Sequence, residues 1–166
     1  MSRKIERFTQ RNRRILHLGQ EAATTYHRGR YDTCHLLLGM IREDGSVAGR
    51  ILRHLGLDEA RILAAVLARK PQEEGESFND FTPAWRAAMV HAVVEARTMK
   101  HYFIGSEHLL LGILRSTDPL TQTLLADTGL VPDTVRPLVL EHLEPFQTRY
   151  PRPLKSLWRR ITRIFG

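Results

Sequence analysis

The sequence predicts an all-α fold of two tandem four-helix units, related by a pseudo-twofold repeat and followed by a C-terminal amphipathic helix. The main observation is an internal repeat, because the run YDTCHLLLGMI at residues 31–41 recurs as YFIGSEHLLLGIL at residues 102–114. His35 falls on His108, an offset of 73 residues (108 − 35), and the same offset holds along most of both units. Apolar residues recur at three- and four-residue spacing, which indicates helices, and no segment has the pattern of a strand.

Four helices are expected in the first unit, each begun by a residue whose side chain can cap a helix N-terminus. Thr9 begins a helix that runs to about residue 26, and Thr33 begins the helix with the first leucine run. Ser46 begins the third helix, which ends at Gly56 because glycine suits the left-handed backbone after a helix. Asp58 begins the fourth helix.

The second unit repeats this plan. Thr82, followed by proline at the first helical position, begins a helix that runs to about residue 100. Ser106 offers a hydroxyl that can cap the second leucine-rich helix, and Glu107 then lies at the positive end of the helix dipole. Asp118 begins the seventh helix and residue 132 the eighth, where Pro137 should kink or delay the helix because proline lacks a backbone N–H.

Composition divides the chain into a first repeat at residues 1–69, a polar linker at 70–80, a second repeat at 81–145 and a basic tail at 146–166. The tail has apolar residues at helical spacing, with arginines on the other side. Its apolar face could lie on an anionic membrane surface, insert into a groove of a partner, or pack back on the body. This tail interaction face consists of Leu154, Leu157, Trp158, Ile161, Ile164 and Phe165.

The net charge of +7 belongs mostly to the tail. The tail contains six basic and no acidic residues, so the other 19 basic and 18 acidic residues nearly balance. Nucleic acid is therefore not a favoured partner, since few aromatic residues accompany the basic ones. The polar start predicts no signal peptide, and no run of about twenty apolar residues predicts a membrane span. We expect a cytoplasmic protein. The alternative is a peripheral membrane protein that contacts the membrane through its tail.

No set of residues typical of catalysis is present. The phosphate-binding pattern G-x-x-x-x-G-K-[ST] does not occur. The single cysteine, Cys34, excludes an internal disulfide and lacks an evident base. His35 and His108 each precede a leucine run, where capping or packing is favoured over a metal role. We expect no enzymatic activity, no cofactor and no metal site.

The Phe-Thr pairs, the run Gly-Ser-Glu-His-Leu-Leu-Leu-Gly and a later Leu-Gly-Leu resemble the N-terminal domain of the Clp ATPases, closest to the ClpC branch. The resemblance covers Glu6 to Leu143 and implies a tandem-repeat recognition domain without the ATPase modules. It implies as partners the Clp ATPase or protease components, or the client proteins of the Clp system. The expected role is that of an adaptor, a decoy or a regulator in Clp-dependent proteolysis.

The same resemblance implies a phosphoarginine site in the second repeat, formed by Glu107, Thr82 and Arg86. A carboxylate such as Glu107 can pair with a guanidinium through two parallel hydrogen bonds. A helix N-terminus with a threonine hydroxyl and a nearby cation suits the phosphate. The family tends to have lysine at the position of Arg86. From the residues alone, Glu107 could equally serve only its helix dipole, and Thr82 only as a cap.

The equivalent site in the first repeat is expected to be degraded. Cys34 replaces the family's glutamate and Asp32 its glycine, while Arg7 and Thr9 remain. With its usual pKa of about 8.5, a thiol is mostly neutral at neutral pH and cannot neutralise a guanidinium. Asp32 could reach in as a substitute carboxylate. At most one working site is therefore predicted.

A different reading makes the repeats a structural docking platform. The C-terminal helix would then tether this platform to a membrane surface or to a protease complex.

Overall fold

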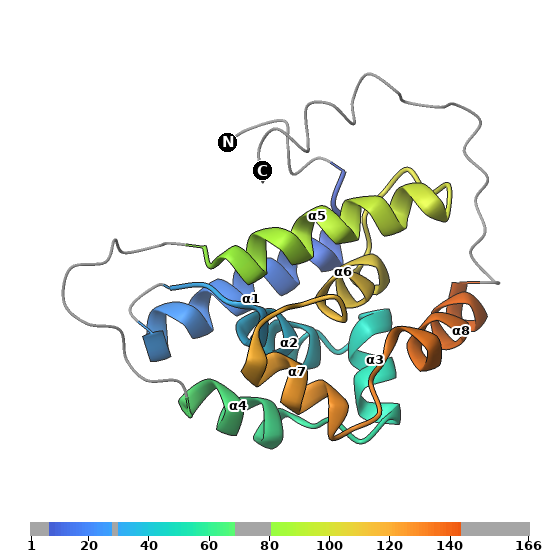
Figure 1. The fold of residues 1–166 in the computed structure, drawn as a ribbon. Coiled ribbons are helices and arrows are strands. Elements are labelled where there is room, and N and C mark those ends of the chain that lie inside the picture. The colour runs from blue at the N-terminus through green and yellow to red at the C-terminus, as the bar shows by residue number, and fades with distance from the viewer. Residues whose placement is uncertain (1–6, 28–29, 69–80, 144–166) are drawn as a thin grey trace.

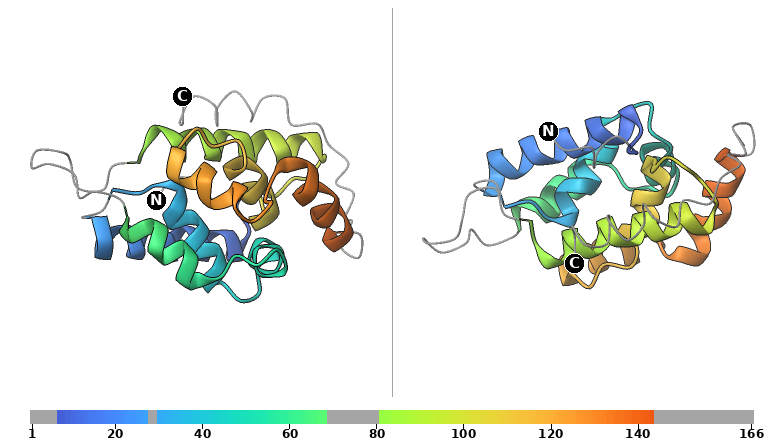
Figure 2. Two further views of the ribbon diagram at one scale, coloured as in Figure 1. Left: turned by 60° about the horizontal axis from the view of Figure 1, so that its bottom comes forward. Right: turned by 90° about the horizontal axis from the view of Figure 1, so that it is seen from above.

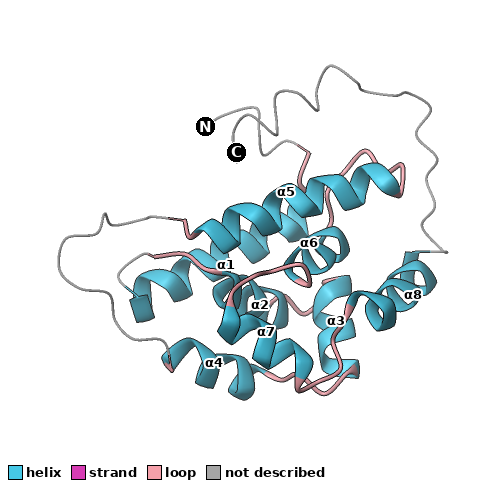
Figure 3. Ribbon diagram, viewed as in Figure 1, coloured by secondary structure: helices cyan, strands magenta, loops and turns pink. Residues whose placement is uncertain are grey.

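The computed structural model describes residues 7–27, 30–68 and 81–143 of the chain (Figure 1). Over these residues the structure is all-helical, as predicted, with eight α-helices and no β-strand (Figure 3). Four helices come from each predicted repeat. They are α1 (Gln10–His27), α2 (Thr33–Arg42), α3 (Val47–His54), α4 (Glu59–Leu67), α5 (Pro83–Thr98), α6 (Ser106–Ile113), α7 (Pro119–Ala126) and α8 (Pro132–Leu143).

Two predicted segments lie outside the described residues: the linker at 70–80, and the tail at 146–166 with its apolar face from Leu154 to Phe165. Within the described part of the chain, every helix is too short or too polar to cross a membrane.

The two repeats interlock around a pseudo-twofold axis. Helices α2 and α6 lie in the middle of the molecule, with α1 and α5 along one side (Figure 1), and the view from above shows α1 and α5 flanking them (Figure 2). Two isolated β-bridges join the repeats, Phe8 with Ile104 and Tyr31 with Phe81. Because Phe8 and Phe81 are equivalent under the repeat, these bridges are copies of each other. Each one places the start of a first helix beside the entry to the leucine-rich helix of the other repeat.

The leucine runs form the core, as their composition predicts. All eight residues of α6 are buried, and so are nine residues of α2. A glycine in each central helix lets the neighbouring backbone approach closely. A Cβ at Gly39 would lie 2.4 Å from the carbonyl oxygen of Ile15, and a Cβ at Gly112 would lie 2.4 Å from that of Ala88. These contacts are also equivalent under the repeat.

Most of the predicted caps are confirmed, and two are wrong. Asp32, not Thr33, caps α2 through its side chain, which accepts the N–H of Cys34 at 3.0 Å. Gly105, not Ser106, is the N-cap of α6. In both helices the residue predicted to be the cap is the first helical residue, and its hydroxyl contacts the other repeat: Ser106 Oγ accepts the N–H of Ala48 at 3.2 Å.

Pro137 does not delay the last helix, because α8 begins at Pro132 and continues through it. The predicted stop at Gly56 is confirmed, since this residue has a φ of 80°, and Gly129 follows α7 with a similar φ of 67°. A left-handed backbone of this kind is expected where a helix ends on glycine.

Candidate functional site

Glu107 lies at the start of α6, with its carboxylate folded back over Gly105. A Cβ at Gly105 would lie 2.2 Å from Glu107 Oε1, so the carboxylate occupies the space that a side chain there would fill. The Ser106 hydroxyl donates to Oε2 at 3.4 Å. The side chain of Glu107 is 11% exposed, so the acid is held near the surface with one edge open to solvent.

The start of α1, from the other repeat, lies against this end of α6. The N–H of Thr9 donates to the carbonyl of Ile104 at 3.1 Å, and the N–H of Ile104 donates to the carbonyl of Arg7 at 2.7 Å. The buried amide of Asn12 donates to the carbonyls of Ile104 and Gly105. We call this meeting of the α1 and α6 N-termini the Glu107 junction. Asn12 was not predicted as a site residue, because nothing in its sequence context points to α6.

The equivalent meeting of the α5 and α2 N-termini is called the Asp32 junction. Here the N–H of Thr82 donates to the carbonyl of Tyr31 at 3.0 Å, and Arg86 Nε donates to the carbonyl of Phe81 at 3.1 Å. Thr82 caps α5 by accepting the N–H of Trp85 at 3.2 Å. The structure therefore places Thr82 against Tyr31, the residue before Asp32, and Arg86 against Phe81 of the same junction.

The predicted grouping of Glu107 with Thr82 and Arg86 is not found. Thr82 caps the beginning of α5, whereas the segment that enters α6 starts from its far end, where the N–H of His101 donates to the carbonyl of Ala96 at 2.8 Å. A helix rises about 1.5 Å per residue, so the two ends of this stretch are about 20 Å apart. Both sites are instead shared between the repeats.

The two junctions each have a buried carboxylate, supplied from different positions. At the Glu107 junction the N-cap is glycine and the acid comes from the second helical residue. At the Asp32 junction the N-cap is itself the acid, and Cys34 takes the second helical position, fully buried. The residue types at these two positions are coupled. A side chain at position 105 would collide with the Glu107 carboxylate, so glycine at the cap goes with glutamate at the second helical position. The first repeat therefore has a buried acid at the cap position and none at the second helical position.

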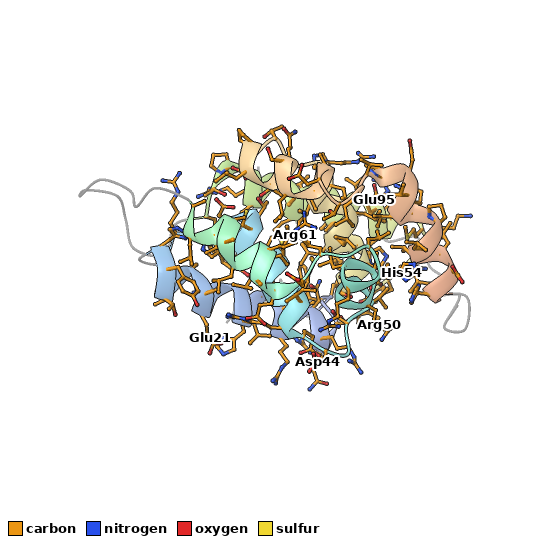
Figure 4. The ribbon with its side chains drawn as sticks, turned by 90° about the horizontal axis from the view of Figure 1, so that it is seen from below. Glu21, Asp44, Arg50, His54, Arg61 and Glu95 are labelled. Atoms are coloured by element: carbon orange, nitrogen blue, oxygen red, sulfur yellow. The ribbon has the colours of Figure 1, made fainter. Side chains whose placement is uncertain are left out.

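Glu107 differs from the other buried glutamates in its partners. Glu43 pairs with Arg11 and Arg14, at 3.7 and 2.9 Å. The Glu95 carboxylate of α5 lies between Arg115, which follows α6, and Arg136 of α8 (Glu95 is labelled in Figure 4). Among the described residues, Glu107 has no arginine or lysine within ion-pair distance.

Burial raises the pKa of Glu107, because the charged form loses its water. Hydrogen bonds from its own backbone N–H and from Ser106 lower the pKa and only partly oppose this effect. A buried acid with a raised pKa and no cation beside it is typical of a functional site.

Two histidines, His108 and His101, lie next to Glu107. His108 Nδ1 accepts the N–H of Gly105 at 2.9 Å, and its Nε2 lies 2.8 Å from His101 Nδ1. The capping role predicted for His108 is thus confirmed, and the role of His101 was missed because no motif marks it. His101, Glu107 and His108 have ligand atoms within 4.8 Å of one another. They suit a metal poorly, since His108 needs its proton on Nε2 while Nδ1 accepts the cap N–H.

A second group of this kind, Asp32, Cys34 and Asp118, lies at the Asp32 junction. Asp32 Oδ1 caps α2, and Asp118 Oδ2 caps α7 by accepting the N–H of Thr121 at 2.8 Å. One oxygen of each aspartate is therefore already bonded to a helix N-terminus. The group is explained by two capped helices that meet at their starts.

We expect the free energy of unfolding to fall as the pH is lowered from about 6.5 towards 3. Burial lowers the pKa of His108 to about 3, so the unfolded chain takes up its proton first. The slope from this group reaches about 1.4 kcal/mol per pH unit. The raised pKa of Glu107 acts in the opposite sense, since the folded chain takes up that proton first.

Urea unfolding at pH 7.5, 6 and 5 measures this slope. His108→Asn, which keeps an acceptor for the Gly105 N–H and cannot titrate, should flatten the curve. An equally steep curve for this variant would contradict the assignment to His108.

Taken together, the interlocked helices and the two shared junctions define an all-α tandem-repeat domain of two four-helix units. Residues 7–128 match the family described as the Clp repeat (R) N-terminal domain. The chain belongs to this family, which is the protein-interaction module of the Clp ATPases, and the resemblance seen in the sequence is confirmed.

Similar proteins include members of several Clp branches. The chain is 32% identical over 144 residues to the "Negative regulator of genetic competence ClpC/MecB" of Bacillus subtilis, which covers 86% of this chain and 18% of that protein. It is 32% identical over 139 residues to the chaperone protein ClpB of Oceanobacillus iheyensis, with 82% and 17% covered. The solved N-terminal domain of ClpD from Arabidopsis thaliana superposes with a TM-score of 0.67 and 25% identity, covering 84% of this chain and 96% of that one. The chain thus spans under a fifth of the length of these curated relatives.

Proposed function

We propose that the chain is a non-enzymatic recognition module that binds phosphoarginine on proteins marked for the Clp system, through the Glu107 junction. It acts as an adaptor, a decoy or a regulator of Clp-dependent proteolysis, with Clp ATPase or protease components and their client proteins as partners. Phosphoarginine enters this proposal through the family resemblance. The observation that supports it most is the buried Glu107, which lacks a cationic partner among the described residues.

The chain's other buried glutamates indicate which group Glu107 would take. Glu43 and Glu95 are each paired with two guanidinium groups. A guanidinium from a client supplies the same partner to Glu107. Charge-assisted pairs of this kind are about twice as strong as neutral hydrogen bonds, and burial strengthens them further.

The phosphate of the same ligand would lie at the start of α1. The first turn of α1 contains no acidic residue, so its positive end is not neutralised. Thr9 caps this end by accepting the N–H of Asn12 at 3.2 Å. Arg13, which is exposed and equivalent to Arg86, is one turn further along. The site proposed from the geometry is therefore Glu107 with Thr9 and Arg13, one part from each repeat.

The Asp32 junction supports a weaker proposal. Asp32 is 3% exposed and already accepts the N–H of Cys34 and the hydroxyl of Thr33. We propose that it serves mainly the fold, with Thr82 and Arg86 at the same junction. The alternative of a docking platform tethered by its C-terminal helix depends on residues 146–166, which lie outside the described part of the chain.

Isothermal titration calorimetry of the full chain with free phosphoarginine tests the proposed function. We expect saturable binding to one site, and much weaker binding of free arginine and of phosphoserine, since each supplies only half of the ligand. An absence of binding by phosphoarginine would overturn the proposal.

A further inference from the structure

A pair of histidine rings meets at the same place in each repeat. His101 Nδ1 lies 2.8 Å from His108 Nε2, and His27 Nδ1 lies 2.8 Å from His35 Nε2. The ring centroids are 5.0 and 4.9 Å apart, and both pairs have an interplanar angle of 78°. His35 and His108 therefore each have a histidine partner in the same geometry. The partners His27 and His101 do not align at the offset of 73 residues (101 − 27 = 74).

The hydrogen bonds determine where the protons of the His101–His108 pair lie. Gly105 donates its N–H to His108 Nδ1 at 2.9 Å, so that nitrogen carries no proton. The proton of the neutral His108 ring is then on Nε2 and is donated to His101 Nδ1. His101 accepts this bond only while it is neutral, because a protonated imidazole carries a hydrogen on both nitrogens.

We infer that His101 and His108 form a proton relay that positions Glu107, and that protonation of His101 withdraws Glu107 from ligand binding. When His101 takes up a proton from solvent, its Nδ1–H becomes a donor towards His108 Nε2. The His108 ring then changes tautomer: Nε2 releases its proton to solvent and Nδ1 takes up a proton from solvent, so that the ring stays neutral. Once protonated, His108 Nδ1 can no longer accept the Gly105 N–H. It instead donates its hydrogen to Glu107 Oε1, which lies 3.2 Å away.

His108 Nδ1–H then competes with a guanidinium for the Glu107 carboxylate. The hydrogen bond from the Gly105 N–H to His108, which caps α6, is lost. The part concerning a ligand rests on the proposed function. The rearrangement of the relay follows from the hydrogen bonds alone and does not require a ligand.

Protonation falls first on His101, because this ring is half-buried whereas His108 is 1% exposed. Burial lowers the pKa of both rings. From α6, the ionised Glu107 favours a proton on the pair. From the segment before α1, Arg7 opposes it, since its guanidinium donates to the carbonyl of Tyr102, next to His101. Lys100, beside His101 in its own loop, is exposed and acts more weakly through solvent.

Nitrogen-15 NMR of the imidazole rings in the full chain tests the relay between pH 7.5 and 5. We expect His108 to carry its proton on Nε2 at pH 7.5 and on Nδ1 once His101 has titrated. The amide of Gly105 should lose its protection from hydrogen exchange over the same range. If His101 titrates while His108 keeps its proton on Nε2 and Gly105 stays protected, the inference is overturned.

Two variants connect the relay to binding. His101→Asn keeps an oxygen acceptor near the position of Nδ1 but cannot be protonated, whereas His101→Phe removes the acceptor. For the wild type, affinity for phosphoarginine should fall by up to about tenfold per pH unit below the pKa of His101. His101→Asn should retain only the dependence that comes from Glu107, and His101→Phe should bind more weakly at every pH.

An unchanged pH profile for His101→Asn would contradict the relay. A wild type that binds no phosphoarginine at any pH would overturn the proposed function, whereas the NMR result would still decide on the relay.

Discussion

Replacing Glu107 with alanine is expected to weaken phosphoarginine binding by about thirtyfold or more, the largest effect of any single substitution at the proposed site. Removing one partner of a desolvated, hydrogen-bonded charge pair costs about 2 kcal/mol or more, and this energy corresponds to about thirtyfold in affinity. The stability of the fold should not fall. The lost carboxylate is buried without a cation among the described residues, so removing it leaves no buried charge unpaired.

Calorimetry on two matched variants separates charge from position. Glu107→Gln keeps the volume and the hydrogen-bonding oxygen, so any loss of affinity beyond a few-fold reports the charge. Cys34→Ala changes the equivalent residue of the other junction and should bind as the wild type does. Wild-type affinity in Glu107→Ala would remove Glu107 from the site.

The same titration distinguishes the shared site from a site within one repeat. If Glu107 works with the start of α1, Thr9→Ala and Arg13→Ala should weaken binding. Thr82→Ala and Arg86→Ala should then have little effect, because they change the Asp32 junction. The opposite result would favour the grouping inferred from the sequence.

The sequence predicts the helices well because their signals are local. The predicted caps Thr9, Ser46, Asp58, Thr82 and Asp118 each accept the backbone N–H of the residue three positions on. The two wrong caps arise where two candidates are adjacent or where the cap has no side chain. At α2, Asp32 and Thr33 are both capping types. At α6, Gly105 caps with its backbone alone, and His108 completes the cap from three residues away.

The sequence predicts individual site residues but not which of them come together. The offset of 73 residues aligns Thr9 with Thr82 and places Cys34 on Glu107 (107 − 34). It does not indicate which copy of one segment meets which copy of the other. A duplicated chain can pack each segment against its own repeat or exchange the contacts across the pseudo-twofold axis. This protein exchanges them, through the bridges at Ile104 and Tyr31, and these non-local contacts leave no local pattern.

The packing within each repeat depends on one glycine, and Gly112→Ala is expected to destabilise the fold by about 3 kcal/mol or more. An added Cβ would lie 2.4 Å from the carbonyl oxygen of Ala88 and 2.8 Å from the N of Ala92. Both atoms belong to the backbone of α5, so neither can move without shifting a helix. Overpacking a core costs about 1–3 kcal/mol, and occasionally more. Gly39→Ala should behave alike, since its Cβ would meet the carbonyl of Ile15 at 2.4 Å.

Gly45→Ala is the matched control for this effect in urea unfolding. The three atoms nearest to its Cβ would all belong to the guanidinium of Arg11, the far end of a flexible and largely exposed side chain, so the arginine can move aside. We expect a cost of less than about 1 kcal/mol there, as for most surface substitutions. If Gly112→Ala and Gly45→Ala lost equal stability, close backbone contact between α5 and α6 would not be what holds the second repeat together. If only Gly112→Ala and Gly39→Ala lost stability, the same close contact between the first and second helix would be required in both repeats.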